Sequence, residues 1–346
     1  MKPIHIILAL LVAVFIFTSC EKDIIFKGEI TAPQIVVNSY ITPDSIISAH
    51  ISESRFFLKD SITFKNVINA TVEVWVNGVK KEELIPTEKG SYIGTFKPTI
   101  GDVVKLVVIV PTKNTVRCET IIEPAPQIIS LDTTDLWTGE RYSISTSGSS
   151  TNNGPTIWKQ DTMAVINGHL INFKLKFKDN SANKNYYRII VRKKEYFLKI
   201  DKITNYSLIT FNDNYYFDFS DIVSGNTTNN DPLSMTSGSD YNQYNVFNDE
   251  LFNGKEYTLT FSSIEDIYNF RPGFKNPDIT PFKKEIFVSL QSSSKDYYLY
   301  LKSVPAALYG DSFFSEPVQI HNNIIGGIGI FGSYTSSYTF KYEIKN

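Results

Sequence analysis

Short segments that alternate apolar and polar residues, each closed by a turn signal, make up the N-terminal part of this chain. Ala70–Val76 alternates with a period of two and is followed directly by Asn77-Gly78. Asn-Gly between two such runs is the strongest short-range signal for a β-hairpin, because both turn positions need a positive φ. A second hairpin is predicted near Glu88–Ser91, and the apolar run Val103–Val110 predicts a buried central strand. These patterns restrict the segment to β-sheet.

Composition extends this prediction to the whole chain. The 346 residues include 20 Tyr and 24 Phe, which favours sheet over helix and excludes intrinsic disorder. Residues 34–123 hold about six or seven strand patterns, as expected of an immunoglobulin-like β-sandwich. Pro124 and Pro126 cannot donate to a strand ladder and favour an extended connector. We therefore predict a mainly β protein, with a sandwich at 34–123 and a larger β-rich domain at 127–346.

One or two short helices are expected in the second domain. Ser293 and Asp296 resemble a capping box that precedes apolar residues at helical spacing. Pro305 lies inside this pattern and should end or kink the helix. A short helix or turn is also predicted around Ile264–Phe270.

Two polar inserts interrupt the second domain, at 143–154 and at 224–245. Inserts of this kind in a β-domain are usually exposed binding loops or decoration. Tyr241 and Tyr244 lie in the second insert and are candidates for a partner or ligand surface, because Tyr supplies rigid contact area. Core packing is the alternative role for both side chains.

The N-terminus has the features of a secretory signal. Ile4–Phe17 is apolar apart from one histidine and is too short to span a bilayer comfortably, but it suits the apolar part of a signal peptide. Ser19-Cys20 follows, and a small residue directly before a cysteine resembles the lipobox of bacterial lipoproteins. We therefore expect a signal peptide at 1–19, lipidation of Cys20 and a tether at 20–33. A membrane anchor helix and a secreted protein without lipid are the alternatives.

Lipidation would fix where the protein resides. Several acyl chains hold a protein to a membrane, since each buried CH₂ contributes about 0.8 kcal/mol. Glu21 and Asp23 resemble the short surface-export signals of Bacteroidetes lipoproteins, and the expected location is the outer membrane, with both of its faces left open. Cys118 then remains as a single thiol, which we interpret as a small packing residue.

The sequence offers little chemistry. Gly327, Gly329 and Gly332 formally match G-x-G-x-x-G, but too few residues follow for the second strand and acidic residue of a dinucleotide site. We interpret these glycines as sites of close backbone approach, with a docking surface for a partner as the alternative. No cofactor is expected.

Enzymatic motifs also fail on spacing. Gly310-Asp311-Ser312 resembles the nucleophile block of GDSL-type hydrolases, but His321 is wrongly spaced, so a turn is predicted. The calcium-loop pattern at 179–185 lacks the required Gly and Glu, and no histidines stand at i, i+4 for zinc. With a net charge of −2, nucleic acid is excluded as a partner. We expect a non-enzymatic protein without a metal; a hydrolase is the remote alternative.

The C-terminal block carries a family resemblance. It consists of Tyr297–Ser303, Ser315–Ile324 and Gly326–Gly332, and together with Val36–Asn38 it resembles the DUF4249 family of Bacteroidetes lipoproteins. The resemblance implies an outer-membrane lipoprotein, often encoded near TonB-dependent receptors, and it supplies no catalytic residue. The expected function is a lipid-anchored binding or accessory protein beside a TonB-dependent transporter. A structural or assembly lipoprotein without a small ligand is the alternative, and the sequence names no ligand.

Overall fold

The protein is mainly β, as predicted. The computed structural model describes residues 32–55, 64–149, 157–180, 183–199, 207–214, 219, 221–224, 242–270, 279–309 and 319–345. Its strands are β1 (Ile35–Ile41), β2 (Ser48–Glu53), β3 (Lys65–Asn66), β4 (Thr71–Val76), β5 (Val79–Glu83), β6 (Ile85–Pro86), β7 (Ser91–Ile93), β8 (Val103–Ile109), β9 (Val116–Ile121), β10 (Gln127–Ser149), β11 (Ile157–Lys178), β12 (Tyr186–Lys199), β13 (Ser207–Asn214), β14 (Val246–Asn248), β15 (Glu256–Phe270), β16 (Ile279–Ser293), β17 (Ile328–Ser336) and β18 (Phe340–Lys345). The helical elements are η1 (Glu88–Gly90), η2 (Ile222–Ser224) and α2 (Lys295–Tyr309).

The N-terminal strands form two sheets around one hydrophobic core. One is the four-stranded sheet β5-β4-β8-β9, and the other includes β1, β2, β7 and β6. Both predicted hairpins are confirmed: Asn77 and Gly78 have φ values of 50° and 82° between β4 and β5, and η1 joins β6 to β7. The predicted strand β8 is central, between β4 and β9. The immunoglobulin-like class of this sandwich stays a prediction.

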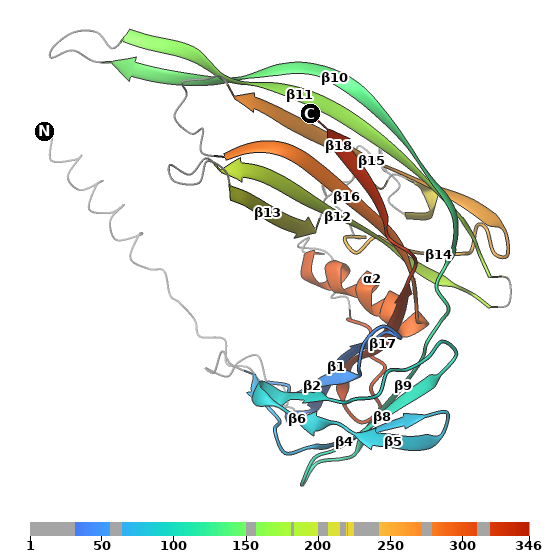
Figure 1. Ribbon diagram of the computed structural model, residues 1–346. Coiled ribbons are helices and arrows are strands. Elements are labelled where there is room, and N and C mark those ends of the chain that lie inside the picture. Colours follow the sequence, from blue (N-terminus) through green and yellow to red (C-terminus); the bar gives the residue numbers. More distant parts are fainter. Residues whose placement is uncertain are drawn as a thin grey trace, which may run out of the picture.

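Strand β17 joins this N-terminal unit to the rest of the chain. Its first part pairs in parallel with β1, with Val36 opposite Ile328 and Ile41 opposite Ser333. Its last residues, Tyr334–Ser336, pair antiparallel with the end of β16. One 11-stranded sheet therefore runs β13-β12-β16-β17-β1-β2-β7-β6, with β14, β18 and β3 paired to β12, β16 and β2 beside this path. Figure 1 shows β1 and β17 between the lower sheets and the long upper strands.

The domain division at Pro124–Pro126 coincides with the passage from β9 to β10. That division stays a prediction, because C-terminal residues also contribute to the first unit. Ile324 and Phe331 are buried in the same hydrophobic core as Val37 and Leu106. The C-terminal part of the chain thus supplies part of the first core.

The second unit packs the sheet β10-β11-β15 against β12, β16 and β18. Its core is rich in aromatic residues, and the rings of Phe173 and Phe261 stack at 4.8 Å. Two predictions are wrong here. In the insert predicted at 143–154, residues 143–149 continue strand β10 instead of forming a loop, because they pair with residues 157–164 of β11, and 150–154 lie outside the described residues. Ile264–Phe270 is not helical but continues β15, paired with 164–170 of β11.

Helix α2 is confirmed, with two corrections. Its N-cap is Ser294 rather than Ser293, since the Tyr297 N–H donates to Ser294 Oγ at 3.4 Å. The helix also continues past Pro305 to Tyr309, so Pro305 does not end it, and the alternative of a kink stays a prediction. Proline removes one backbone hydrogen bond of the helix, and the packing of the buried Tyr297, Tyr298 and Leu301 stabilises the preceding turns.

The β1–β17 pair depends on glycine. Gly329 has a φ of +123°, and a Cβ there would lie 2.1 Å from the backbone oxygen of Val37. A Cβ at Gly327 would lie 2.6 Å from the backbone oxygen of Ile35. The predicted close backbone approach is therefore present at both positions.

We predict that Gly329→Ala separates β1 from β17 and lowers the free energy of unfolding by about 3 kcal/mol or more. Gly101→Ala is the matched control, because Gly101 has a φ of +88° but open space around it. In the control, the free energy of unfolding should fall only by the strain of a left-handed backbone at alanine, about 1–2 kcal/mol. Urea unfolding of the two variants compares them, and equal losses would contradict the close approach.

Candidate functional site

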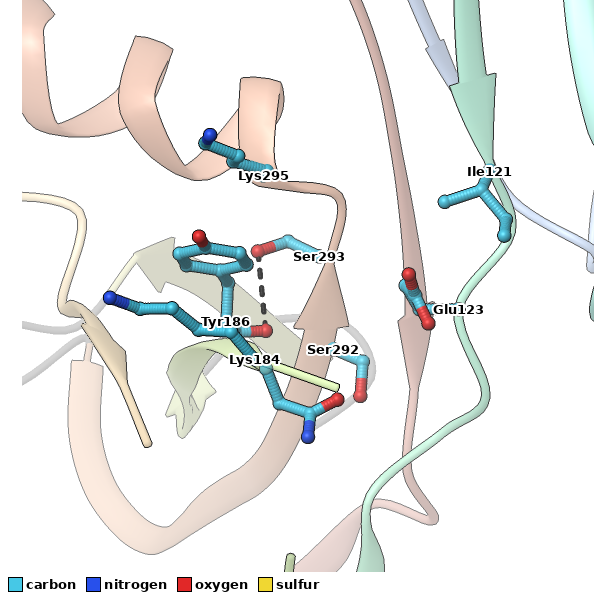
Figure 2. Close-up of a pocket in the computed structure, with 8 residues that line it drawn as sticks. Ile121, Glu123, Lys184, Tyr186, Ser292, Ser293 and Lys295 are labelled. Atoms are coloured by element: carbon cyan, nitrogen blue, oxygen red, sulfur yellow. Dashed lines mark hydrogen bonds between the residues drawn. The ribbon is translucent and has the colours of Figure 1, made fainter. Parts of the chain in front are cut away.

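A pocket of about 390 Å³ lies where the exit from β9 passes the start of α2. Three separate segments line it: the end of β9 with its connector, the turn before β12, and the junction of β16 with α2. Its lining residues are Ile121, Glu123, Lys184, Asn185, Tyr186, Ser292, Ser293 and Lys295. Figure 2 shows Ile121 and Glu123 on one side and Lys184, Tyr186 and Lys295 on the other. A volume of this size suits a small ligand.

Ser333 of β17 fixes the two sides of the pocket relative to each other. It is fully buried, and its hydroxyl donates to the backbone oxygen of Ile121 and accepts from Thr120 Oγ1 at 3.3 Å. Its backbone N–H donates to Ser294 Oγ at 3.1 Å, and its carbonyl accepts from the Ser294 N–H at 3.0 Å. One residue therefore holds β9 and the first turn of α2 together.

The turn before β12 is held by short-range contacts. Ser293 Oγ donates to the Tyr186 carbonyl at 3.4 Å, the bond drawn in Figure 2. The ring of Tyr186 lies 4.8 Å from that of Tyr298 on α2. Burial raises the pKa of the Tyr186 phenol, so this hydroxyl stays protonated at neutral pH and can donate a hydrogen bond.

The charges of the pocket are of two kinds. Lys184 forms an ion pair with Glu250, which raises the pKa of Lys184 and lowers that of Glu250. Glu123 and Lys295, by contrast, have no hydrogen-bond or ion-pair partner for their side chains in the described residues. Burial raises the pKa of the Glu123 carboxyl. The pocket thus presents one carboxyl and one ammonium group that the protein itself leaves unpaired.

A tyrosine cluster borders this pocket on α2. Tyr297 lies between the rings of Tyr40, at 5.2 Å, and Tyr334, at 6.0 Å. The Arg188 guanidinium lies 5.4 Å from the ring centre of Tyr244 and donates to the Tyr297 hydroxyl at 3.4 Å. Tyr40 is 42% exposed, so the cluster reaches the surface. Tyrosine and arginine side chains in this arrangement are typical of recognition surfaces.

The predicted site residues do not form one site. Tyr244 belongs to the tyrosine cluster, whereas Tyr241, most of the 224–245 insert and Cys20 lie outside the described residues. Gly327 and Gly329 lie against β1, as described above. Gly332 makes room for Tyr297, because a Cβ there would lie 2.7 Å from the Tyr297 Cβ. Whether a partner docks on these glycines stays a prediction.

Sequence reasoning missed Glu123, Lys184 and Lys295. Glu123 directly precedes the Pro124–Pro126 connector, and Lys295 opens the predicted helix, so each stood beside a recognised feature. A charged residue beside a domain connector is too common a pattern to indicate a pocket. Only the fold brings these residues together.

A separate group of charged side chains lies between the sheets of the second unit. Lys284 Nζ contacts Glu265 at 2.8 Å and Glu195 at 3.2 Å, and Glu265 is 1% exposed. Burial disfavours the charged form of Lys284, but the two carboxylates outweigh it, so the pKa of Lys284 is raised. Because these charges are paired, we interpret the group as structural.

The remaining reactive side chains occupy separate structural settings. Cys118 is buried in the first core, as predicted, and burial raises the pKa of its thiol to about 12. Among the described residues, no three His, Cys, Asp or Glu side chains form a group that could hold a metal ion. No helix in the described ranges is long and apolar enough to cross a membrane. The Gly310–Ser312 segment lies outside the described residues.

The fold and site define a mainly β protein of several sheets, with a short helix beside a polar pocket. The family model of DUF4249, a domain of unknown function, matches residues 21–339. The chain therefore belongs to the DUF4249 family, which confirms the resemblance of its C-terminal block. No match was found among curated proteins.

Two solved structures show a weak likeness to this chain. One, from work on the promiscuous specificity of carbohydrate-binding modules of the β-sandwich superfamily, is 9% identical, with a TM-score of 0.17, over 73% of this chain and 99% of that one. The other, a putative membrane anchored protein from Corynebacterium diphtheriae, is 10% identical, with a TM-score of 0.19. This alignment covers 85% of this chain and 58% of that one. Likenesses this weak establish no function.

We predict that Ser333→Ala loosens the joint that forms the pocket. Loss of its hydroxyl leaves the Ile121 carbonyl and Thr120 without their partner, which should cost about 1–3 kcal/mol. Ser39→Ala is the matched control, because buried Ser39 also donates to a carbonyl, that of Ser48 at 2.6 Å, but within the first unit only.

Amide hydrogen exchange at Ile122 and Tyr297 should distinguish the two variants. Exchange at both positions should become faster in Ser333→Ala and remain near the wild-type rate in Ser39→Ala. The same exchange pattern in the two variants would show that Ser333 has no special role in the joint.

Proposed function

We propose that this protein is a lipid-anchored outer-membrane binding or accessory protein that works beside a TonB-dependent transporter. The observation that carries the proposal is Ser19-Cys20, which is separated from the apolar run Ile4–Phe17 by Thr18 alone. This pattern supplies both a signal peptide and a cysteine for acyl chains. The proposed role is non-enzymatic.

The geometry of β1 supports this arrangement. The tether leads into β1 at Ile35, whereas Ile41 at its other end pairs with Ser333, the residue that binds the start of α2. A strand rises about 3.3 Å per residue, so these two ends lie roughly 20 Å apart. An anchor at Cys20 would therefore attach the protein through one end of the strand, with α2 and its pocket at the other end.

The partner in this proposal is a transporter, as the family resemblance implies. The tyrosine cluster around α2 supports a recognition role, since Tyr and Arg carry much of the binding free energy in protein interfaces. Tyr40 and Tyr244 offer accessible parts of this cluster. The polar pocket beside it provides a separate place for a small ligand.

We expect Cys20→Ala to abolish lipidation and release the protein from the outer membrane, because the acyl chains are its proposed attachment. Intact-mass measurement of the wild-type protein should show cleavage before Cys20 and an added diacylglyceryl group. Cys118→Ala is the matched control and should remain lipidated and membrane-bound. An unmodified wild-type N-terminus that keeps residues 1–19 would refute the anchor.

Co-purification tests the partner. We expect a TonB-dependent receptor to be recovered with the tagged wild-type protein from gently solubilised outer membranes, and recovery should fall at least about tenfold for Arg188→Ala, which removes an arginine contact to the tyrosines. Arg192→Ala, an exposed site on the same strand, is the control. If no such receptor co-purifies, the accessory role fails and the structural or assembly alternative is favoured.

A further inference from the structure

We propose that the pocket between β9 and α2 binds a short zwitterionic peptide, with the peptide ammonium group at Glu123 and its carboxylate at Lys295. The inference deepens the proposed binding role by naming the class of ligand. It is carried by the two pocket charges that the protein leaves without a partner.

Glu123 is the acceptor for the ammonium group. Its side chain is partly buried at the edge of the pocket and has no cation or hydrogen-bond donor beside it among the described residues. A buried carboxyl without such a partner is held in an unfavourable environment, as the raised pKa of Glu123 reflects. A ligand ammonium group supplies the missing positive charge and donates charge-assisted hydrogen bonds.

Lys295 is the donor for the carboxylate. The other lysine of the lining, Lys184, is already neutralised by Glu250, so Lys295 is the cation that remains available in the described lining. Figure 2 shows Lys295 and Glu123 on different segments of the lining, at the start of α2 and after β9. A ligand that satisfies both must carry its two charges at separate ends.

The uncharged lining and the volume fit a peptide backbone between these ends. Ser292 and Ser293 offer hydroxyl groups, Tyr186 offers an aromatic ring, and Ile121 offers an apolar contact that is 41% exposed. A pocket of about 390 Å³ is near the lower end of the range for small-ligand sites. This size favours a dipeptide or tripeptide over a longer chain.

Ligands with a single charge fit this lining less well. A simple anion at Lys295 leaves Glu123 unpaired and adds a second negative charge to the pocket. A simple amine at Glu123 likewise leaves Lys295 unpaired. The half-buried Glu123 is stabilised by a partner of its own, and the exposed Lys295 is accessible to a ligand carboxylate, so the zwitterion is the class that engages both groups.

The test is calorimetric titration of the purified full chain with alanyl-phenylalanine, alanyl-alanine and alanyl-serine, each in free, N-acetylated and C-amidated form. We expect the free dipeptides to bind and the acetylated or amidated forms to bind at least about tenfold more weakly, the effect of losing one charged hydrogen bond. Glu123→Gln should weaken binding of the free peptide by a similar factor, but it should leave the affinity for the acetylated peptide unchanged. Lys295→Met should likewise weaken binding of the free peptide and leave the affinity for the amidated peptide unchanged.

The controls are Glu88→Gln and Lys81→Met, which remove the same charges outside the pocket and should bind every peptide as the wild type does. Circular dichroism melting confirms that each variant is folded. The inference is overturned if no free dipeptide binds to the folded wild type at 10 mM, roughly the weakest affinity of interest. It is also overturned if acetylation and Glu123→Gln weaken binding additively, because the peptide ammonium group and Glu123 would then not contact each other. Neither outcome bears on lipidation or receptor co-purification, which test the proposed function separately.

Discussion

The parallel pairing of β17 with β1 is the interaction on which the arrangement of this molecule depends. It brings residues from opposite ends of the sequence into one sheet, with Gly329 opposite Val37 at a distance that admits no Cβ. The same strand then pairs with β16 and so links the two units through backbone hydrogen bonds. Ser333, between these two pairings, adds its bonds to β9 and to the N-terminus of α2. The pocket exists because one strand makes all of these contacts.

The parts of the fold that could be predicted are those that depend on neighbouring residues. The turn at Asn77-Gly78 follows from the φ angles that these residues adopt, and α2 follows from the spacing of Tyr297, Tyr298 and Leu301. The β1–β17 pair could not be predicted in this way, because its partners lie almost 300 positions apart and nothing local specifies a parallel neighbour. Residues 143–149 were misjudged for the same reason: their small polar side chains indicate a loop, but pairing with β11 stabilises the strand.

The N-cap of α2 shows how a local pattern can be right in type and wrong by one residue. Ser293 and Ser294 are equivalent as capping residues, and only the capping-box spacing to Asp296 favoured Ser293 in the sequence. In the structure, Ser293 is the last residue of β16 and its hydroxyl donates to Tyr186. Ser294 is the residue that faces Ser333, and it caps the helix as a result. Tertiary contact therefore outweighed the weak local preference for Ser293.

The same contacts explain why the pocket can act as a defined site. Glu123 follows β9 and Lys295 opens α2, so the backbone positions of these two residues are set by the joint between the two elements and not by a single loop. Sites held by strands and helices keep their geometry better than sites on loops. Ser333 binds β9 through its hydroxyl and α2 through its backbone, which leaves little freedom for the two sides to move apart. A ligand that bridges Glu123 and Lys295 would meet backbone segments already held in place by the fold, so the ordering cost on the protein side would fall mainly on the exposed Lys295 side chain.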